Sequence, residues 1–144
     1  MVEPALLGPI DAVLAPVAAY VVLVLVLANF GTRYLAHRTH VRQAAEGADA
    51  VSRYGLHELS NFLLVFATFY FTTLHQHEGI VLSLLVVGML LTDFFEFEGR
   101  RVEARQDLPI EQPKGAIAAS VLVLFYAFYV SLFFVIAPVW NAVI

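Results

Sequence analysis

Four long apolar runs alternate with shorter polar segments along the chain, and this pattern predicts an all-α integral membrane protein. The runs cover about residues 13–35, 56–74, 79–97 and 115–137. At about 1.5 Å per residue, helices of these lengths are about 28 to 35 Å long, enough to cross the hydrocarbon core of a bilayer. We therefore expect a single transmembrane domain over residues 1–144, built as a four-helix bundle.

Polar segments indicate where these helices end. The first helix should continue in water to about Gln43, and residues 46–49 should break it. Residues 75–78 are too few for anything but a tight turn between the second and third spans. The third helix should continue to about Gln106, and Pro138 should end or kink the fourth.

The positive charges indicate the orientation of the protein in the cell membrane. All eight Lys and Arg residues lie within 33–53 or 100–114, in the first and third connections. Short loops rich in Lys and Arg stay in the cytoplasm. We therefore expect loops 36–55 and 98–114 to be cytoplasmic, and residues 75–78 and both termini to lie outside.

The second and fourth runs resemble each other. Residues 63–72 and 122–131 align at an offset of 59 with four identical positions. Such a repeat is typical of two tandem helical hairpins that arose by duplication. Chance similarity between two Phe-rich apolar helices explains the same matches, so both interpretations stay open.

Each predicted span carries one polar residue at a similar depth. Counting along the helices places Asn29, Asn61, Asp93 and Ser120 about 5 to 8 Å inside the cytoplasmic boundary. Arg33 lies one turn from Asn29 and should reach Asp93, whose charge is otherwise costly in lipid. This polar layer is either an ion or proton site open to the cytoplasm or a contact that fixes helix register, and we favour the second interpretation.

A row of small residues begins the fourth span. It consists of Gly115, Ala116, Ala119 and Ser120. Small residues at this spacing allow another helix to approach closely, so the row is a predicted packing face.

Acidic residues between positions 96 and 111 are interspersed with Arg100, Arg101 and Arg105. We interpret these charges as ion pairs within helix ends, which is their usual role.

Patterns typical of catalysis or cofactor binding do not occur in the sequence. There is no cysteine, and His57 and His75 mark opposite ends of one span, which disfavours a haem between two imidazoles. We expect no metal site, no cofactor and no enzymatic activity, with His37, His40 and His57 as exposed loop histidines.

The aromatic side chains of the spans could line a slot for a quinone or carotenoid, but lipid contact is their commoner role. The net charge of −4 argues against a nucleic-acid partner.

Two segments carry a resemblance to a known family, residues 29–34 (NFGTRY) and 54–61 (YGLHELSN). Arg is also seven times as frequent as Lys, and acidic residues exceed basic ones. On these features the chain resembles a family of small haloarchaeal four-span membrane proteins of unknown function. The resemblance implies no activity, but such relatives are associated with respiratory membrane genes such as those of cytochrome bc complexes.

We therefore expect a non-catalytic accessory or assembly subunit of a larger membrane complex, with a respiratory complex suggested by the resemblance. Its partners would be membrane lipid and other membrane protein subunits or further copies of itself. The alternative is a small homo-oligomeric transporter or channel that uses the intramembrane Asp93. A haem or quinone subunit is a third interpretation.

Overall fold

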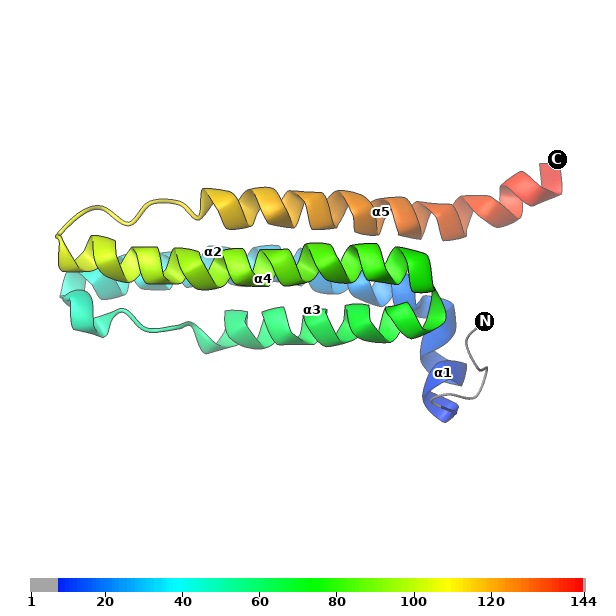
Figure 1. Ribbon diagram of the computed structural model, residues 1–144, viewed down its shortest axis with the longest axis horizontal. Helices are drawn as coiled ribbons and strands as arrows, with labels where there is room; N and C mark the ends of the chain where they lie inside the picture. The colour runs from blue at the N-terminus through cyan, green and yellow to red at the C-terminus, as the bar shows by residue number, and fades with distance from the viewer. Residues whose placement is uncertain (1–7, 144) are drawn as a thin grey trace.

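The computed structural model describes residues 8–143, apart from the side chain of Phe134, and its regular elements are all helical (Figure 1). Residues 1–7 and 144 of the predicted domain lie outside the described residues. The predicted all-α class is confirmed. The elements are α1 (Pro9–Leu14), the 3₁₀ turn η1 (Ala15–Val17), α2 (Ala18–Glu46), the 3₁₀ turn η2 (Ala48–Ala50), α3 (Gly55–Leu74), α4 (Gln76–Arg105) and α5 (Lys114–Val143).

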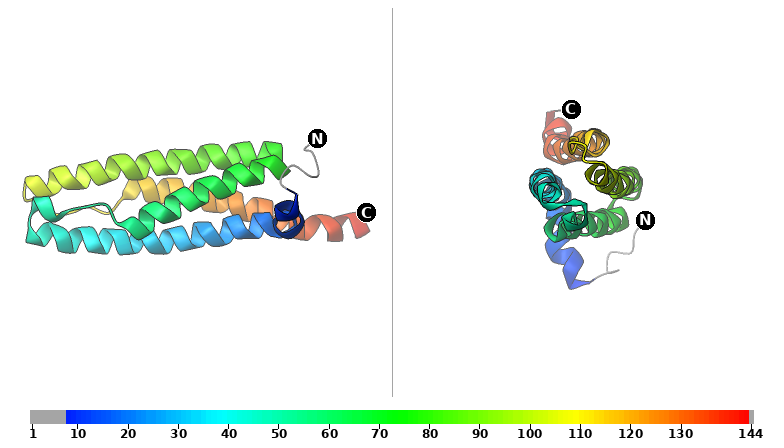
Figure 2. Two further views of the ribbon diagram at one scale, coloured as in Figure 1. Left: turned by 90° about the horizontal axis from the view of Figure 1, so that it is seen from below. Right: turned by 90° about the vertical axis from the view of Figure 1, so that its left-hand side faces the viewer.

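The four long helices, α2 to α5, form an up-and-down bundle (Figure 2). α2 packs against α3 and α5, and α4 packs against the same two helices. The core between them is apolar and includes Val22, Val26, Leu64, Val86 and Val123, each at most 2% exposed. Each helix therefore turns one face to its neighbours and the opposite face outward.

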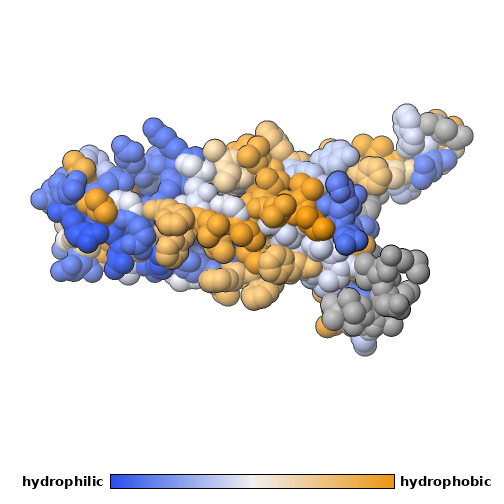
Figure 3. Space-filling model, in the orientation of Figure 1, coloured by the Kyte–Doolittle hydropathy of each residue, from blue (hydrophilic) through white to orange (hydrophobic). Residues whose placement is uncertain are grey.

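Three helical stretches are long and apolar enough to cross a membrane, namely Pro9–Glu46, α4 and α5. α3 is not among them, and its first two turns carry the polar residues His57, Glu58 and Asn61. A band of apolar side chains covers the middle of the bundle, whereas the end with the two long connections is polar (Figure 3). The protein thus has three helices that suit a membrane by composition, and α3 is packed alongside them.

Two helix ends differ from the prediction, and at a third, Pro138, one of the two predicted outcomes is excluded. Only His75 separates α3 from α4, because its extended backbone is enough to reverse the chain, so residues 76–78 belong to the first turn of α4 and not to a loop. Pro138 lies inside α5, which continues to Val143. A proline near a helix end removes a single backbone hydrogen bond, which the helix tolerates. Pro16 falls in η1, so α2 begins only at Ala18 and α1 lies at an angle to it (Figure 1).

α5 extends beyond the other long helices at the end that holds the α3–α4 turn (Figure 1). Gly115 lies against Thr92 and Glu96 of α4. Because both helices rise by about 1.5 Å per residue, α5 reaches the level of the start of α4 after about 18 residues. Its last turns therefore form an overhang, residues 134–143, in which Val139 and Trp140 are exposed.

The burial pattern agrees with the proposed repeat of two hairpins. At the offset of 59, Asn61 corresponds to Ser120 and Leu64 to Val123, and all four side chains are at most 1% exposed. Helices of one bundle bury a residue at every turn, however, so unrelated helices at the same depth give a similar match. The duplication stays a prediction.

The α3–α4 turn depends on Gly79. A side chain here would collide with the backbone of Thr72, and overpacking of this kind costs about 1–3 kcal/mol. We expect Gly79→Ala to lower the free energy of unfolding by about 2 kcal/mol, measured by thermal unfolding in detergent micelles. The control is Gly88→Ala, also in α4, where a new Cβ meets nothing within 4 Å and which should be neutral or slightly stabilising. Equal stability of both variants would contradict this account of the turn.

Candidate functional site

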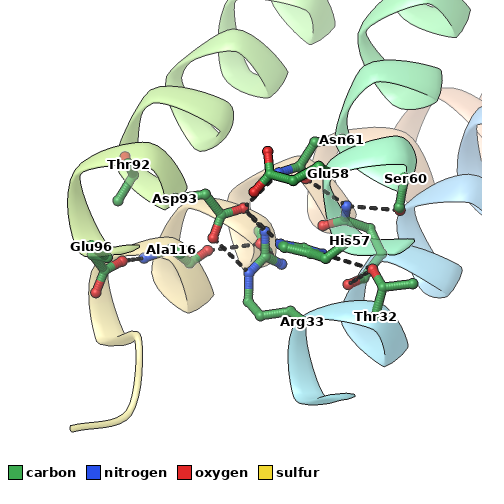
Figure 4. A network of polar contacts seen from close by, with 12 residues as sticks. Thr32, Arg33, His57, Glu58, Ser60, Asn61, Thr92, Asp93, Glu96 and Ala116 are labelled. Carbon is green, nitrogen blue, oxygen red and sulfur yellow. Dashed lines mark hydrogen bonds and ion pairs between the residues drawn. The ribbon is translucent and has the colours of Figure 1, made fainter. Parts of the chain in front are cut away.

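An ion pair between Arg33 of α2 and Asp93 of α4 lies at the centre of the predicted polar layer (Figure 4). Arg33 Nη2 donates to Asp93 Oδ2, and Arg33 Nε donates to Oδ1 at 3.3 Å, so the contact is bidentate. The two side chains are only 4% and 11% exposed. Little water reaches this pair, and loss of either partner would leave a buried charge without compensation.

Asp93 also accepts hydrogen bonds from two side chains of α3. Asn61 Nδ2 donates at 3.2 Å and His57 Nε2 at 3.1 Å, both to Oδ2. Together with the two nitrogens of Arg33, four donor atoms surround the carboxylate, about as many as its lone pairs accept. Asp93 is therefore held as an ionised acceptor by α2 and α3 together.

The remaining predicted residues extend this arrangement to all four long helices. Asn29 Nδ2 donates to Asn61 Oδ1 at 2.8 Å and to Ser60 Oγ at 3.0 Å. Arg33 Nη1 donates to the hydroxyl oxygen of Ser120 on α5. The five polar residues selected from the sequence thus meet in one cluster, while its role stays a prediction. We call it the Asp93 network, and it consists of Asn29, Thr32, Arg33, His57, Ser60, Asn61, Asp93 and Ser120.

The sequence analysis missed Thr32, His57 and Ser60 as members of this network. His57 was expected to be an exposed loop histidine, but this is wrong, since the residue is 5% exposed and its Nδ1 lies 2.8 Å from Thr32 Oγ1. α3 begins before His57 and places it one turn from Asn61 on the same helix face. That spacing of four residues was the available signal.

The predicted packing face of α5 lies against α4. Ala116 and Ser120 are buried, and Ala119 packs against the core. A Cβ at Gly115 would crowd the Glu96 side chain. The backbone N–H of Ala116 donates to Glu96 Oε1, so this carboxylate caps the first turn of α5 and fixes the approach of the two helices.

The predicted ion pairs within helix ends are largely wrong. Among the described residues of α4, one intrahelical pair lies within 4 Å, between Arg101 and Glu98 at 3.9 Å. Glu98 instead accepts from Arg53 Nη2 at 3.1 Å. The Arg53 guanidinium lies 4.4 Å from the ring centres of both Phe94 and Phe97. An arginine held by two rings loses little further freedom on pairing, which favours it over a mobile partner on the same helix.

A second buried polar cluster lies further toward the polar end of the bundle. His40, which is 3% exposed, lies with Nδ1 2.8 Å from Arg100 Nη1 and Nε2 2.9 Å from the carbonyl oxygen of Ser52. Arginine only donates, so Nδ1 accepts and Nε2 carries the proton. Burial, and then the charge of Arg100, lower the pKa of His40 to about 4. His40 is therefore a neutral link between α2, α4 and the connection 47–54, and the expectation of an exposed loop histidine is wrong here too.

An apolar layer closes the Asp93 network on the side away from the long connections. Val26, Leu64, Met89 and Val123 each lie three or four residues from a network residue of their own helix, and each is at most 1% exposed. Close packing at this level leaves no polar path along the bundle axis. Within the described residues, no three His, Cys, Asp or Glu side chains are grouped so that they could hold a metal ion. The arrangement is a closed polar contact that joins four helices.

The bidentate pair predicts strong coupling between Arg33 and Asp93. Asp93→Asn and Arg33→Gln should each lower the free energy of unfolding by about 3–5 kcal/mol, because each leaves a buried group without its partner. The double variant should lose clearly less than the sum, since it leaves no uncompensated charge. Unfolding in detergent micelles measures this cycle, with Glu98→Gln at a half-exposed position as the control that changes stability by less than about 1 kcal/mol. Additive losses would mean that the two side chains do not form a pair.

The second cluster predicts a loss of stability in acid. Since the pKa of His40 is lowered from 6.5 to about 4 in the folded protein, only the unfolded chain binds the proton between these values. Stability should therefore fall as the pH drops from about 6.5 to about 4, by at most about 1.4 kcal/mol per pH unit from this residue. His40→Gln keeps a donor and an acceptor but does not titrate. If the slope of stability against pH in this interval is the same in wild type and His40→Gln, the assignment to His40 fails.

No curated protein and no solved structure matches the chain. A family model described as "Domain of unknown function (DUF7313)" matches residues 3–144, nearly the whole sequence. This agrees with the expectation of an uncharacterised family, and the chain belongs to the DUF7313 family.

Proposed function

We propose that the protein is a non-catalytic accessory or assembly subunit of a larger membrane complex. In this proposal α2, α3, α4 and α5 all span the cell membrane, with loops 36–55 and 98–114 in the cytoplasm and both termini outside. The observation that carries the proposal is the closed Asp93 network. Its charges compensate each other, its hydrogen bonds run between helices, and a packed apolar layer lies above it.

Such a network suits a structural subunit better than a channel for ions or protons. A buried ion pair contributes little net stability, because desolvation offsets most of the attraction, but it disfavours every other helix register. Arg33 and Asp93 are in contact only at one relative height of α2 and α4. The hydrogen bonds of Asn61 and Ser120 fix the heights of α3 and α5 in the same way. A rigid bundle of fixed register presents its outer faces to a partner in a constant arrangement.

The overhang of α5 supports a contact with another membrane protein. Ile136, Val139 and Trp140 are each more than half exposed in this segment, which extends past the α3–α4 turn. Among the described residues, the central part of α5 packs on α2 and α4, whereas the overhang extends past them and offers apolar surface on several sides. We infer that the overhang is the main contact with the partner subunit.

The nature of the partner rests on the resemblance described from the sequence. We propose a haloarchaeal origin, supported by the high ratio of Arg to Lys and the acidic excess. Within that setting, a respiratory complex of the cytochrome bc type is the partner to test first.

Extraction of native membranes with a mild detergent, followed by native electrophoresis and mass spectrometry, tests this proposal. We expect the protein to migrate with other subunits in one large species. Trp140→Ala in the overhang should weaken this association, whereas Phe66→Ala, a similarly exposed aromatic position in the middle of α3, should not. A species that contains only this chain, as monomer or homo-oligomer, would refute the proposal.

One observation favours the alternative of a small homo-oligomeric transporter or channel, namely that Asp93 and His57 are ionisable groups buried beside the apolar layer. Ionisable side chains at such a depth commonly belong to ion or proton routes. Because the single bundle is closed, this route would have to form between copies. Proton or ion flux into liposomes by the purified protein, abolished in Asp93→Asn, would establish the alternative in place of the first proposal.

A further inference from the structure

The Asp93 network contains one ionisable group that still has a nitrogen free to take a proton. We propose that the network binds a proton at His57 Nδ1, supplied from the polar end of the bundle, and that the Thr32 hydroxyl reverses its hydrogen bond when the proton arrives. This proton site depends only on the geometry of the network, and it stands whether the protein is a scaffold or a transporter.

Asp93 itself is a poor proton acceptor in this arrangement. Both of its oxygens face N–H donors, from Arg33, His57 and Asn61. Protonation would weaken the three hydrogen bonds that Oδ2 accepts and would remove the charge that compensates the buried Arg33 guanidinium. The carboxylate is therefore the fixed anion of the network.

The contact with Asp93 also determines the tautomer of His57. An ionised carboxylate only accepts hydrogen bonds, so His57 Nε2 carries a hydrogen whether the ring is neutral or charged. The nitrogen that gains or loses a proton is then Nδ1. This atom lies 2.8 Å from Thr32 Oγ1, a hydroxyl that both donates and accepts.

Thr32 has a second partner that makes both protonation states possible. Its Oγ1 also lies 3.0 Å from the carbonyl oxygen of Asn29. When His57 is neutral, the hydroxyl donates to Nδ1. When a proton from water forms an N–H bond at Nδ1, that group donates to Oγ1, and the hydroxyl rotates to donate to Asn29. In both states the Thr32 hydroxyl has an acceptor, and in the charged state the Nδ1–H group of His57 has one too.

The charges around His57 allow a cation at this position. Arg33 lies beside it on α2, Asp93 contacts it from α4, and Glu58 is its neighbour on α3 (Figure 4). His40 of α2 is near enough to interact with it electrostatically, Arg100 of α4 interacts in the same way with Asp93, and Ser120 of α5 contacts Arg33. Among the described residues, the charged group in direct contact with His57 is Asp93. Protonation therefore converts a neutral hydrogen bond between α3 and α4 into an ion pair, while Arg33 keeps its own contacts to the same carboxylate.

Access for the proton comes from the long connections. His57 lies in the first turn of α3, directly after the connection 47–54, whereas Leu64 and the apolar layer lie two turns further along the helix. A proton thus reaches and leaves the site from one side of the bundle only. The site can report the pH of that side without letting protons cross.

Nuclear magnetic resonance of ¹⁵N-histidine in the full chain, purified in detergent micelles, tests the proposal directly. We expect His57 Nε2 to carry a hydrogen at every pH and Nδ1 to gain one as the pH is lowered, while the Asp93 carboxyl carbon, followed by ¹³C labelling, stays in its ionised form. A neutral His57 with its hydrogen on Nδ1, or an Asp93 that titrates before His57, would overturn the assignment.

Two variants of Thr32 test the role of its hydroxyl. Thr32→Val keeps the shape of the side chain but leaves a charged Nδ1–H without an acceptor, so the protonated ring should be less populated than in the wild type under the same conditions. Thr32→Ser retains the hydroxyl and should match the wild type. The exposed His77 of α4 serves as the internal control, and its ring signals should be the same in all three proteins. Protonation of His57 at the same pH in Thr32→Val and wild type would overturn the proposed reversal.

Discussion

The bidentate contact between Arg33 and Asp93 is the constraint on which the rest of the bundle depends. Both charges are almost completely buried, and each would be very unfavourable there without the other. α2 and α4 do not pack side by side as α2 and α3 do, so this contact reaches across the bundle and makes their relative height a requirement of the fold. Helices with apolar faces all round lack such a requirement, because they slide past one another at little cost.

The other polar contacts follow from the position of this pair. Asn61 and His57 bring α3 to the carboxylate, and Ser120 brings α5 to the guanidinium. The His40–Arg100 contact repeats the arrangement nearer the polar end, where it also ties down the connection 47–54. The bundle thus has an apolar half, whose packing is permissive, and a polar half in which specific hydrogen bonds select one arrangement.

The polar contacts and the apolar packing occupy different parts of the bundle. The polar contacts lie toward the end of the bundle with the long connections, and the buried apolar side chains of Val26, Leu64, Met89 and Val123 separate them from the other end. The polar contacts and the exposed overhang of α5 lie at opposite ends of the bundle (Figure 1).

The sequence by itself determined well how far along its helix each residue lies, because this needs only a count of residues. The helical class, three of the four predicted membrane-spanning helices, the polar extensions and the common level of Asn29, Asn61, Asp93 and Ser120 all follow from counting residues. Which way each helix faces is a different matter. Apolar side chains surround these helices, so their periodicity does not show which face is buried. Only the tertiary structure, by setting the rotation of each helix, decided that His57 binds Asp93, that Glu96 caps α5 and that His40 is buried against Arg100.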